Sequence, residues 1–260
     1  MLGESFFTFG TSNIVVIGGT GHLGSAIVQA FVEAGANVLV VDKDREALGN
    51  LTGRERYHPY FCDLESCESR LDLARQCAKM FDRIDIIVNA AALVGTSDLE
   101  GWNTSFLDQS IDTWSRAMVV NLNSVFHICQ LLTPLMCKKI GGAIINIGSI
   151  YGELGPDWRL YEGLDMSNAA AYSVSKGGLA QLTRWLASTL GPQIRINTVS
   201  PGGIYRQQPQ SFVKRYEAKT PLGRMASEQD IVSVILFLAS SAAGYITGQN
   251  ICVDGGYSII

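Results

Sequence analysis

The chain lacks an excess of either charge. Its 260 residues include 20 lysines and arginines against 24 aspartates and glutamates, which leaves a formal net charge of -4 at pH 7. Nucleic acids and anionic membrane surfaces are bound by basic protein faces. We therefore expect no nucleic acid and no membrane as partner, whereas backbone amides alone can hold a small anionic ligand.

Cysteine and histidine are too few and too scattered for a metal centre. The six cysteines contain no C-x-x-C pair, and none stands at metal-ligand spacing from the three histidines. We predict no metal, and we interpret the cysteines as reduced thiols packed as small apolar residues, which favours a cytoplasmic protein. The residues are Cys62, Cys67, Cys77, Cys129, Cys137 and Cys252, with His22, His58 and His127.

Targeting and membrane-spanning segments are also missing. Residues 1–13 have no basic stretch followed by a long apolar run, so no signal peptide is expected. The longest uncharged run, Ala117–Cys137, could span a bilayer by length, but it contains polar residues and a proline and is interpreted as a buried helix. Without linker or repeat, the chain is predicted to form one domain over residues 1–260, with residues 1–11 as an N-terminal extension.

Short β-branched runs alternate with longer helical patterns along the whole chain. Runs such as IVVIG and VLVV are apolar on both faces, which is typical of strands covered by helices on both sides. We predict an α/β fold, a Rossmann-like doubly wound parallel sheet of about seven strands in the order 3-2-1-4-5-6-7. The predicted strands are Asn13–Ile17, Asn37–Val41, Tyr57–Cys62, Ile84–Asn89, Ala143–Ile147, Ile194–Ser200 and Asn250–Val253, and the predicted helices span about 23–34, 45–51, 65–81, 111–139, 170–190 and 228–240.

Two segments without clear periodicity, Leu93–Ser110 and Ile150–Asn168, follow the fourth and fifth predicted strands. In open α/β sheets, ligands bind outside the carboxyl ends of the strands. Long loops at that edge are more often functional than idle. We therefore predict that both segments form a wall of a binding site.

A glycine-rich turn joins the first predicted strand to the first helix, in the sequence IGGTGHLG. Its G-x-x-G-x-x-G spacing lets the backbone approach a pyrophosphate, and the start of the helix offers unpaired N–H groups. We predict a dinucleotide site here, and the alternative is a tight turn with no ligand. The predicted contacts are Gly18, Thr20, Gly21, His22, Leu23 and Gly24.

Two aspartates end the second and third predicted strands. Asp42 is placed to accept hydrogen bonds from the adenosine ribose and to repel a 2′-phosphate, which favours NAD(H) over NADP(H). The neighbouring Lys43, also a predicted cofactor contact, and Arg45 blunt that preference. Asp63, followed by Leu64, is a candidate partner for the adenine amino group or, equally, the N-cap of the next helix.

A tyrosine and a lysine stand one helical turn apart in AAYSVSKGG, as Tyr172 and Lys176. A tyrosine titrates near pH 10, so acid–base work near neutrality needs help, and a nearby ammonium favours the phenolate. Ser149 ends the fifth strand at the same sheet edge, and Asn121 is polar where a helical pattern requires an apolar residue. A lone serine or asparagine of this kind is usually structural, and only the set of four indicates catalysis.

In their order, these motifs resemble the short-chain dehydrogenase/reductase family over residues 11–258. The matching segments are GGTGHLG, VNAAA, VVNLNSVF, GSI, YSVSK, NTVSPGG, TPLGRM and VDGG. The resemblance implies a catalytic tetrad. In it, Tyr172 exchanges the substrate proton and Ser149 holds the substrate oxygen, while Lys176 lowers the pKa of Tyr172 and binds the nicotinamide ribose, and Asn121 positions a water. It further implies cofactor contacts at Asn89, Ala90, Ala91, Tyr172, Lys176, Pro201, Gly202 and Ile204, and a homotetramer or dimer formed through the helices at 111–139 and 170–190.

The chain departs from the family pattern at three places. The family's main branch has threonine and glycine where this chain has Ile17 and His22, so the loop follows the form of the extended branch. The usual N-N-A-G motif appears as NAAA, which keeps only Asn89. After Pro201-Gly202, the customary threonine is displaced, and Arg206 stands near its place.

The segment from Ser149 to Tyr172 is about ten residues longer than is common in that family, and such loops are usually functional. It carries ring faces and charged groups, which indicate a polyhydroxylated or phosphorylated substrate rather than a steroid or fatty-acyl chain. The alternative is a surface or subunit-contact loop. The segment 150–168 resembles the corresponding segment in a subgroup of that family, which is associated with nonulosonic-acid and flagellin-glycan synthesis. The candidate substrate contacts are Ser149, Tyr151, Trp158, Arg159, Tyr161 and Arg206.

The leading prediction is an NAD(H)-dependent oxidoreductase that interconverts a secondary alcohol and a ketone of a sugar-like small molecule. One alternative is an NADPH-dependent carbonyl or 3-oxoacyl reductase. A third hypothesis, a dinucleotide-binding sensor without catalysis, is suggested by the atypical glycine loop, but a sensor has no need for the Tyr172–Lys176 pair.

Overall fold

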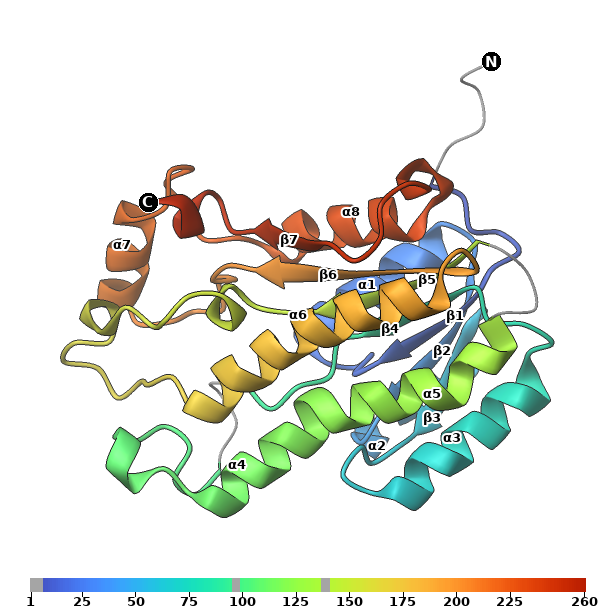
Figure 1. Cartoon of the computed structure of the whole chain (residues 1–260), viewed down its shortest axis with the longest axis horizontal. Coiled ribbons are helices and arrows are strands. Elements are labelled where there is room, and N and C mark those ends of the chain that lie inside the picture. The colour runs from blue at the N-terminus through green and yellow to red at the C-terminus, as the bar shows by residue number, and fades with distance from the viewer. Residues whose placement is uncertain (1–6, 95–98, 137–140) are drawn as a thin grey trace.

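The computed structural model describes residues 7–94, 99–136 and 141–260, and it contains a seven-stranded parallel sheet (Figure 1). The strand order is β3-β2-β1-β4-β5-β6-β7, which confirms the predicted fold and strand order. The strands are β1 (Asn13–Ile17), β2 (Asn37–Asp42), β3 (Tyr57–Phe61), β4 (Ile86–Asn89), β5 (Gly142–Ile147), β6 (Ile194–Pro201) and β7 (Asn250–Val253).

The fourth strand begins later than the sequence predicts, at Ile86 rather than Ile84. The carboxylate of Asp85 accepts a hydrogen bond from the backbone N–H of Asn13 at 2.9 Å and forms an ion pair with Arg83. The backbone N–H of Ile84 donates to the carbonyl of Leu135 rather than to a neighbouring strand. These contacts tie the approach to β4 to other parts of the fold before strand pairing starts.

Helices cover both faces of the sheet, and in Figure 1 α3, α5 and α6 lie in front of it. One core cluster packs α3, α4, α5 and α6 against alternate strand residues such as Val15 and Ile144. The other packs α1, α2 and α8 against the residues between them, such as Val16 and Ile145. The helices are α1 (His22–Glu33), α2 (Arg45–Gly49), α3 (Cys67–Met80), α4 (Ile111–Met118), α5 (Ser124–Met136), α6 (Ala170–Leu190), α7 (Gln210–Ala218) and α8 (Glu228–Ala239).

The predicted helix over 111–139 is continuous but irregular from Ile111 to Met136. A π-helical turn at Val119–Asn123 joins α4 to α5, and residues 137–139 lie outside the described residues, as does Cys137. By length and composition, Ile111–Met136 is the one described helix apolar enough to cross a membrane. This is weak evidence for a membrane protein, because core helices pass the same test. Ala117, Ile128 and Leu132 of this segment are buried in the core.

Two parts of the fold stand beyond the carboxyl ends of the strands. The segment 150–168 forms two short 3-10 turns, Ile150–Gly152 and Trp158–Leu160, and α7 packs beside the second. The sequence analysis did not predict α7. Figure 1 shows α7 and this segment together at the edge of the molecule where strands β5 and β6 end.

The described cysteines are all free, and the described residues contain no group of three or more His, Cys, Asp or Glu side chains that could hold a metal. Burial raises the pKa of the Cys77 and Cys129 thiols to about 12, so both stay protonated and behave as apolar core side chains.

Candidate active site

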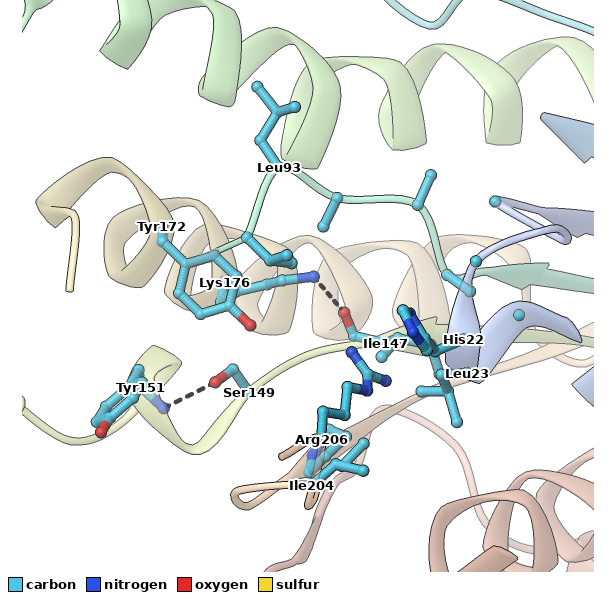
Figure 2. Close-up of a pocket in the computed structure, with 18 of the residues that line it drawn as sticks. His22, Leu23, Leu93, Ile147, Ser149, Tyr151, Tyr172, Lys176, Ile204 and Arg206 are labelled. Atoms are coloured by element: carbon cyan, nitrogen blue, oxygen red, sulfur yellow. Dashed lines mark hydrogen bonds between the residues drawn. The ribbon is translucent and has the colours of Figure 1, made fainter. Parts of the chain in front are cut away.

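A pocket of about 1130 Å³ opens at the carboxyl edge of the sheet and is walled by the segments that follow β1 to β6. It contains most of the predicted site residues, from the glycine loop to the Tyr172 helix. Figure 2 shows Tyr172 and Lys176 on one wall, Ser149 and Tyr151 beside them, and His22 and Leu23 at the other end. The fold therefore gathers residues that are up to 208 positions apart, from Ile17 to Met225.

Ser149, Tyr172 and Lys176 meet at one end of this pocket. Ser149 comes shortly after β5 and has an extended backbone conformation. Its Oγ accepts a hydrogen bond from the Tyr151 N–H at 3.2 Å. Lys176 is 3% exposed, and its Nζ donates to the backbone carbonyl of Ile147 at 2.6 Å. The same Nζ lies 5.8 Å from the centre of the Tyr172 ring. The β5 strand and α6 thus hold the three side chains together.

Burial dominates the protonation of the tyrosine and the lysine. Desolvation raises the pKa of Tyr172, and a hydrogen bond with Ser149 and the charge of Arg206 oppose that rise. Desolvation also lowers the pKa of Lys176, to about 8. The resemblance implies that Lys176 lowers the pKa of Tyr172, and Ser149 and Arg206 act in the same direction.

Asn121 is fixed by the loop after β4 and does not line the pocket. It is 1% exposed, and its Oδ1 accepts from the Leu93 N–H at 2.8 Å, while its Nδ2 donates to the Leu93 carbonyl and to Ser175 Oγ. The π-helical turn in which it sits displaces the helix register at this residue. Its side chain therefore positions the loop wall and the α6 turn that carries the tyrosine.

Asn89, predicted as a cofactor contact, also lies below the pocket. Its Nδ2 donates to Asn146 Oδ1 at 2.8 Å, Asn146 Nδ2 donates to Thr183 Oγ1, and that hydroxyl bonds Thr198 Oγ1 at 2.7 Å. All four side chains are buried. This polar ladder crosses β4, β5 and β6 and ties them to α6, so Asn89 stabilises the sheet edge under the site.

The glycine loop forms a cradle that side chains would fill. Gly18 has φ +82°, and a Cβ on Gly24 would lie 1.9 Å from the Gly18 carbonyl oxygen. Helix α1 begins here with Gly21 as an N-cap that offers no side-chain cap and with no acidic residue in its first turn. A loop packed this tightly, with a free helix start, fits the phosphates of a dinucleotide.

Asp42 and Asp63 lie at the far end of the same pocket. Asp42 Oδ2 accepts from the Thr20 N–H at 3.0 Å, which ties the end of β2 to the glycine loop, and Oδ1 accepts from the Lys43 N–H at 2.7 Å. Asp63 Oδ1 accepts from the Glu65 N–H, while the N-cap of α3 is Ser66. The N-cap alternative for Asp63 is therefore wrong, because a serine three residues later takes that role.

The loop after β6 forms a further wall of the pocket. The Gly203 N–H donates to Tyr216 Oη of α7 at 2.6 Å, and Ile204 forms an isolated bridge with Ala226. A Cβ on Gly202 would lie 2.7 Å from that tyrosine oxygen. The two glycines thus let α7 press directly on the loop that carries the predicted cofactor contacts Pro201, Gly202 and Ile204, all of which line the pocket.

Aromatic rings and hydroxyl groups surround the end of the pocket next to Tyr172. Tyr151 and Tyr161 from the segment 150–168 bond through their hydroxyls at 2.8 Å, and both line the pocket with Arg206. Trp158 and Arg159, also predicted there, do not line it. Arg159 is held to Asp157 at 2.8 Å with its side chain 82% exposed.

The outer half of this segment docks on α7. Arg215 Nη1 donates to the carbonyls of Leu160 at 3.2 Å and Glu162 at 2.7 Å, and Lys219 pairs with Asp157. Two partners, Arg159 first and Lys219 second, hold the pKa of Asp157 well below its usual range. Sequence reasoning missed α7, although Phe212 and Tyr216 stand one helical turn apart. The predicted wall segments Leu93–Ser110 and Ile150–Asn168 do line the pocket, through residues that include Trp102, Asn103, Met166 and Asn168, which the sequence analysis did not single out. Met225 lines the pocket outside both segments and was missed.

The sequence model of one protein family, described as enoyl-(acyl carrier protein) reductase, matches residues 20–258. A 3-oxoacyl-[acyl-carrier-protein] reductase of Thermotoga maritima is 28% identical over 94% of this chain and 97% of its own length. A 7alpha-hydroxysteroid dehydrogenase of Bacteroides fragilis is 32% identical (95% and 94%), and a galactitol 2-dehydrogenase of Cereibacter sphaeroides is 30% identical (94% and 94%). The names of these relatives point to different substrates.

Two solved structures share the fold over nearly the whole chain. A short chain dehydrogenase from Leptospira borgpetersenii with bound NAD+ has a TM-score of 0.87 and 30% identity, and the match covers 99% of this chain and 97% of that one. An NADP complex of RhlG from Pseudomonas aeruginosa has a TM-score of 0.84 and 28% identity, with coverage of 98% and 99%. Either nicotinamide dinucleotide is therefore found in proteins of this shape.

Proposed function

Since this chain belongs to the short-chain dehydrogenase/reductase family, we propose that it is an NAD(H)-dependent enzyme that interconverts a secondary alcohol and a ketone on a sugar or sugar-derived molecule. Membership of the family makes it an oxidoreductase with a nicotinamide dinucleotide cofactor. The choice of NAD(H), the substrate and the residue roles are the proposal.

The convergence of Ser149, Tyr172 and Lys176 in one pocket is the observation that carries this proposal. A bound nicotinamide supplies or accepts the hydride at the substrate carbon. The Ser149 hydroxyl is placed to donate to the substrate oxygen, and Tyr172 is placed to give or take its proton. Because burial raises the pKa of Tyr172, its phenol is protonated and holds the proton that ketone reduction needs, while alcohol oxidation needs its deprotonation.

Lys176 assists this proton transfer and binds the cofactor. Its ammonium donates to the Ile147 carbonyl, which leaves further N–H donors to hold the nicotinamide ribose. With its pKa near 8, it is also able to exchange a proton close to neutral pH. Asn121 serves as a positioning residue through its bonds to Leu93 and Ser175.

The preference for NAD(H) rests on Asp42. Its carboxylate lies in the pocket beside the glycine loop, where it would accept hydrogen bonds from the hydroxyls of the adenosine ribose and repel a 2′-phosphate. Asp42→Ala is expected to lose most of the discrimination against NADPH. Asp72→Ala is a matched control, since Asp72 pairs with Arg75 on α3 and does not line the pocket. An unchanged NADH preference in Asp42→Ala would refute the proposed role of that carboxylate. A parent protein that prefers NADPH would favour the alternative, an NADPH-dependent carbonyl or 3-oxoacyl reductase, and the Thermotoga relative is a 3-oxoacyl reductase by name.

A polar, ring-shaped substrate fits the pocket end near Tyr172. The hydroxyls of Ser149, Tyr151 and Tyr161 offer hydrogen bonds, and Phe212 offers an apolar face. Galactose and galactitol dehydrogenases are among the relatives. An amino-sugar substrate of the nonulosonic-acid or flagellin-glycan type remains our specific proposal, and it rests on the 150–168 segment. A substrate screen of sugars, sugar phosphates and nucleotide sugars, with 3-oxoacyl thioesters as the competing class, tests it.

Turnover in the Tyr172→Phe variant separates an enzyme from a dinucleotide sensor. The variant is expected to bind NADH as the parent does and to lose at least about a thousandfold in kcat, because the proton donor is gone. Fluorescence titration with NADH measures the binding and single-turnover assays measure the chemistry. Parent-like turnover in Tyr172→Phe would refute Tyr172 as the proton donor, and a parent that binds NADH without turnover of any substrate would support the sensor hypothesis.

We further propose a cytoplasmic homo-oligomer, a tetramer or a dimer, formed through the α4–α5 and α6 helices. Large apolar side chains stand exposed on these helices, with Phe126 at 45%, Val174 at 49% and Trp185 at 56% exposure. A second copy of the chain would cover them.

A further inference from the structure

The backbone around Arg206 is held rigidly at the mouth of the pocket. The Arg206 N–H donates to Gln208 Oε1 at 2.8 Å, and Gln208 Nε2 donates back to the Ile204 carbonyl at 2.8 Å. The Tyr205 N–H donates to the Ala226 carbonyl at 2.8 Å. The side chain therefore starts from a fixed point that follows the predicted nicotinamide contact Ile204.

The Arg206 side chain points across the pocket. Figure 2 shows it rising from the Ile204 loop toward His22 and Leu23, the first residues of α1. It is 34% exposed and lines the pocket, and its Nε donates to Glu228 Oε1 at 3.2 Å. That contact uses one edge of the guanidinium, which leaves the two terminal nitrogens available toward the pocket.

Arg206 is the cation at the middle of the pocket. Lys43 stands at the Asp42 end, and Lys176 is buried against Ile147 at the catalytic end. The wall opposite Arg206 is the glycine cradle and the uncapped start of α1, with no acidic residue in its first turn. A dinucleotide whose adenosine lies at Asp42 and whose nicotinamide lies at Tyr172 has its pyrophosphate between these two walls.

We propose that Arg206 binds the pyrophosphate of the dinucleotide from the side opposite α1, with Glu228 orienting its guanidinium. This inference rests on the cofactor site of the proposed function. A guanidinium presents paired N–H donors that match phosphate oxygens, and charge-assisted bonds of this kind are stronger than those of a neutral hydroxyl. The arginine would thus replace the contact of the threonine that the family usually has nearby. The proposal makes Arg206 a cofactor contact, whereas the sequence analysis predicts a substrate contact.

Replacing Arg206 tests the proposal by binding alone. Arg206→Gln is expected to weaken both NADH and ADP-ribose by about tenfold or more, and to make the affinity less sensitive to salt. Adenosine, which has no phosphate, should bind the variant and the parent equally. Isothermal titration with ADP-ribose and adenosine, and fluorescence titration with NADH, give these constants without any substrate.

Three further variants serve as controls and comparisons for Arg206→Gln. Arg224→Gln removes an arginine paired with Asp230 outside the pocket, and it should bind NADH as the parent does. Arg206→Lys should recover part of the lost affinity, and Glu228→Gln should weaken NADH less than Arg206→Gln because the cation stays. Circular dichroism and the melting temperature verify that each variant is folded. We expect little change in either, because the Arg206–Glu228 ion pair is partly exposed and contributes little to stability.

Unchanged binding of ADP-ribose to Arg206→Gln would overturn the proposal. A raised KM for the substrate in the same variant would then indicate that Arg206 binds the substrate, as the sequence analysis predicts. A parent protein that binds neither NADH nor ADP-ribose would instead refute the proposed function, so the two failures are distinguishable.

Discussion

Gly152 and Gly177 lie in backbone contact. A Cβ on Gly152 would sit 2.8 Å from the Lys176 carbonyl carbon and 3.0 Å from the Gly177 N, and a Cβ on Gly177 would sit 3.0 Å from the Gly152 carbonyl oxygen. The turn that carries Ser149 and Tyr151 therefore rests directly on the helix that carries Tyr172 and Lys176. No side chain separates the two halves of the catalytic site.

The first prediction follows from this contact. Gly152→Ala should push the 150–152 turn away from α6, because the added Cβ would clash with backbone that cannot rotate aside. We expect kcat to fall about tenfold or more through displacement of Ser149, with a smaller change in NADH affinity. Gly155→Ala is the matched control, since a Cβ there has no heavy atom within 4 Å. Equal losses in both variants would contradict the proposed role of the contact.

The second prediction concerns the hydrogen bond from the Gly203 N–H to Tyr216 Oη. Tyr216→Phe leaves that N–H without its partner, which costs about 1–3 kcal/mol. Because Gly203 lies in the loop of the proposed nicotinamide contacts, we expect the KM for NADH to rise several-fold as stability drops. Urea unfolding and steady-state kinetics measure the two effects. Tyr205→Phe, at a tyrosine 52% exposed, should change neither.

The third prediction is a pH dependence of stability set by Lys176. Its pKa is about 8 in the folded chain and about 10.4 in the unfolded chain. Between these values only the unfolded chain keeps the proton, so this residue makes the free energy of unfolding rise as the pH increases from about 8 toward 10. Below about pH 8 the cost of the buried cation is fully present.

Lys176→Met removes that cost. The variant should be more stable than the parent at pH 7, by about 2 kcal/mol, and the difference should shrink toward pH 10. Urea midpoints of both proteins across this range measure it, and Lys214→Met at an exposed lysine should show no such trend. A difference independent of pH would refute the account of burial.

The fourth prediction tests the proposed assembly. Trp185→Glu places a charge on an α6 side chain that is 56% exposed in the single chain. We expect the oligomer to dissociate, as measured by light scattering after size-exclusion chromatography, while Tyr245→Glu leaves it intact. A parent chain that is monomeric at micromolar concentration would rule out the homo-oligomer itself.

The strands and most helices were predictable because their signals are local. Runs that are apolar on both faces specify strands covered on two sides, and each strand bound came within two residues of the structure. The π-helical turn had one local sign, the polar Asn121 inside an apolar helical pattern. Helix α7 had too weak a local signal, because nine residues with a mixed polar sequence resemble a loop. Its position becomes clear only from the tertiary contact between Tyr216 and Gly203.

The sequence by itself determined the sheet, the glycine cradle and the spacing of Tyr172 and Lys176, since each depends on neighbours along the chain. Only the tertiary structure decided that Arg159 turns outward to Asp157, that Asn89 serves the buried ladder, and that Arg206 points to the start of α1. The reason is physical: the direction of a long polar side chain is set by which distant carboxylate, carbonyl or helix end lies within its reach.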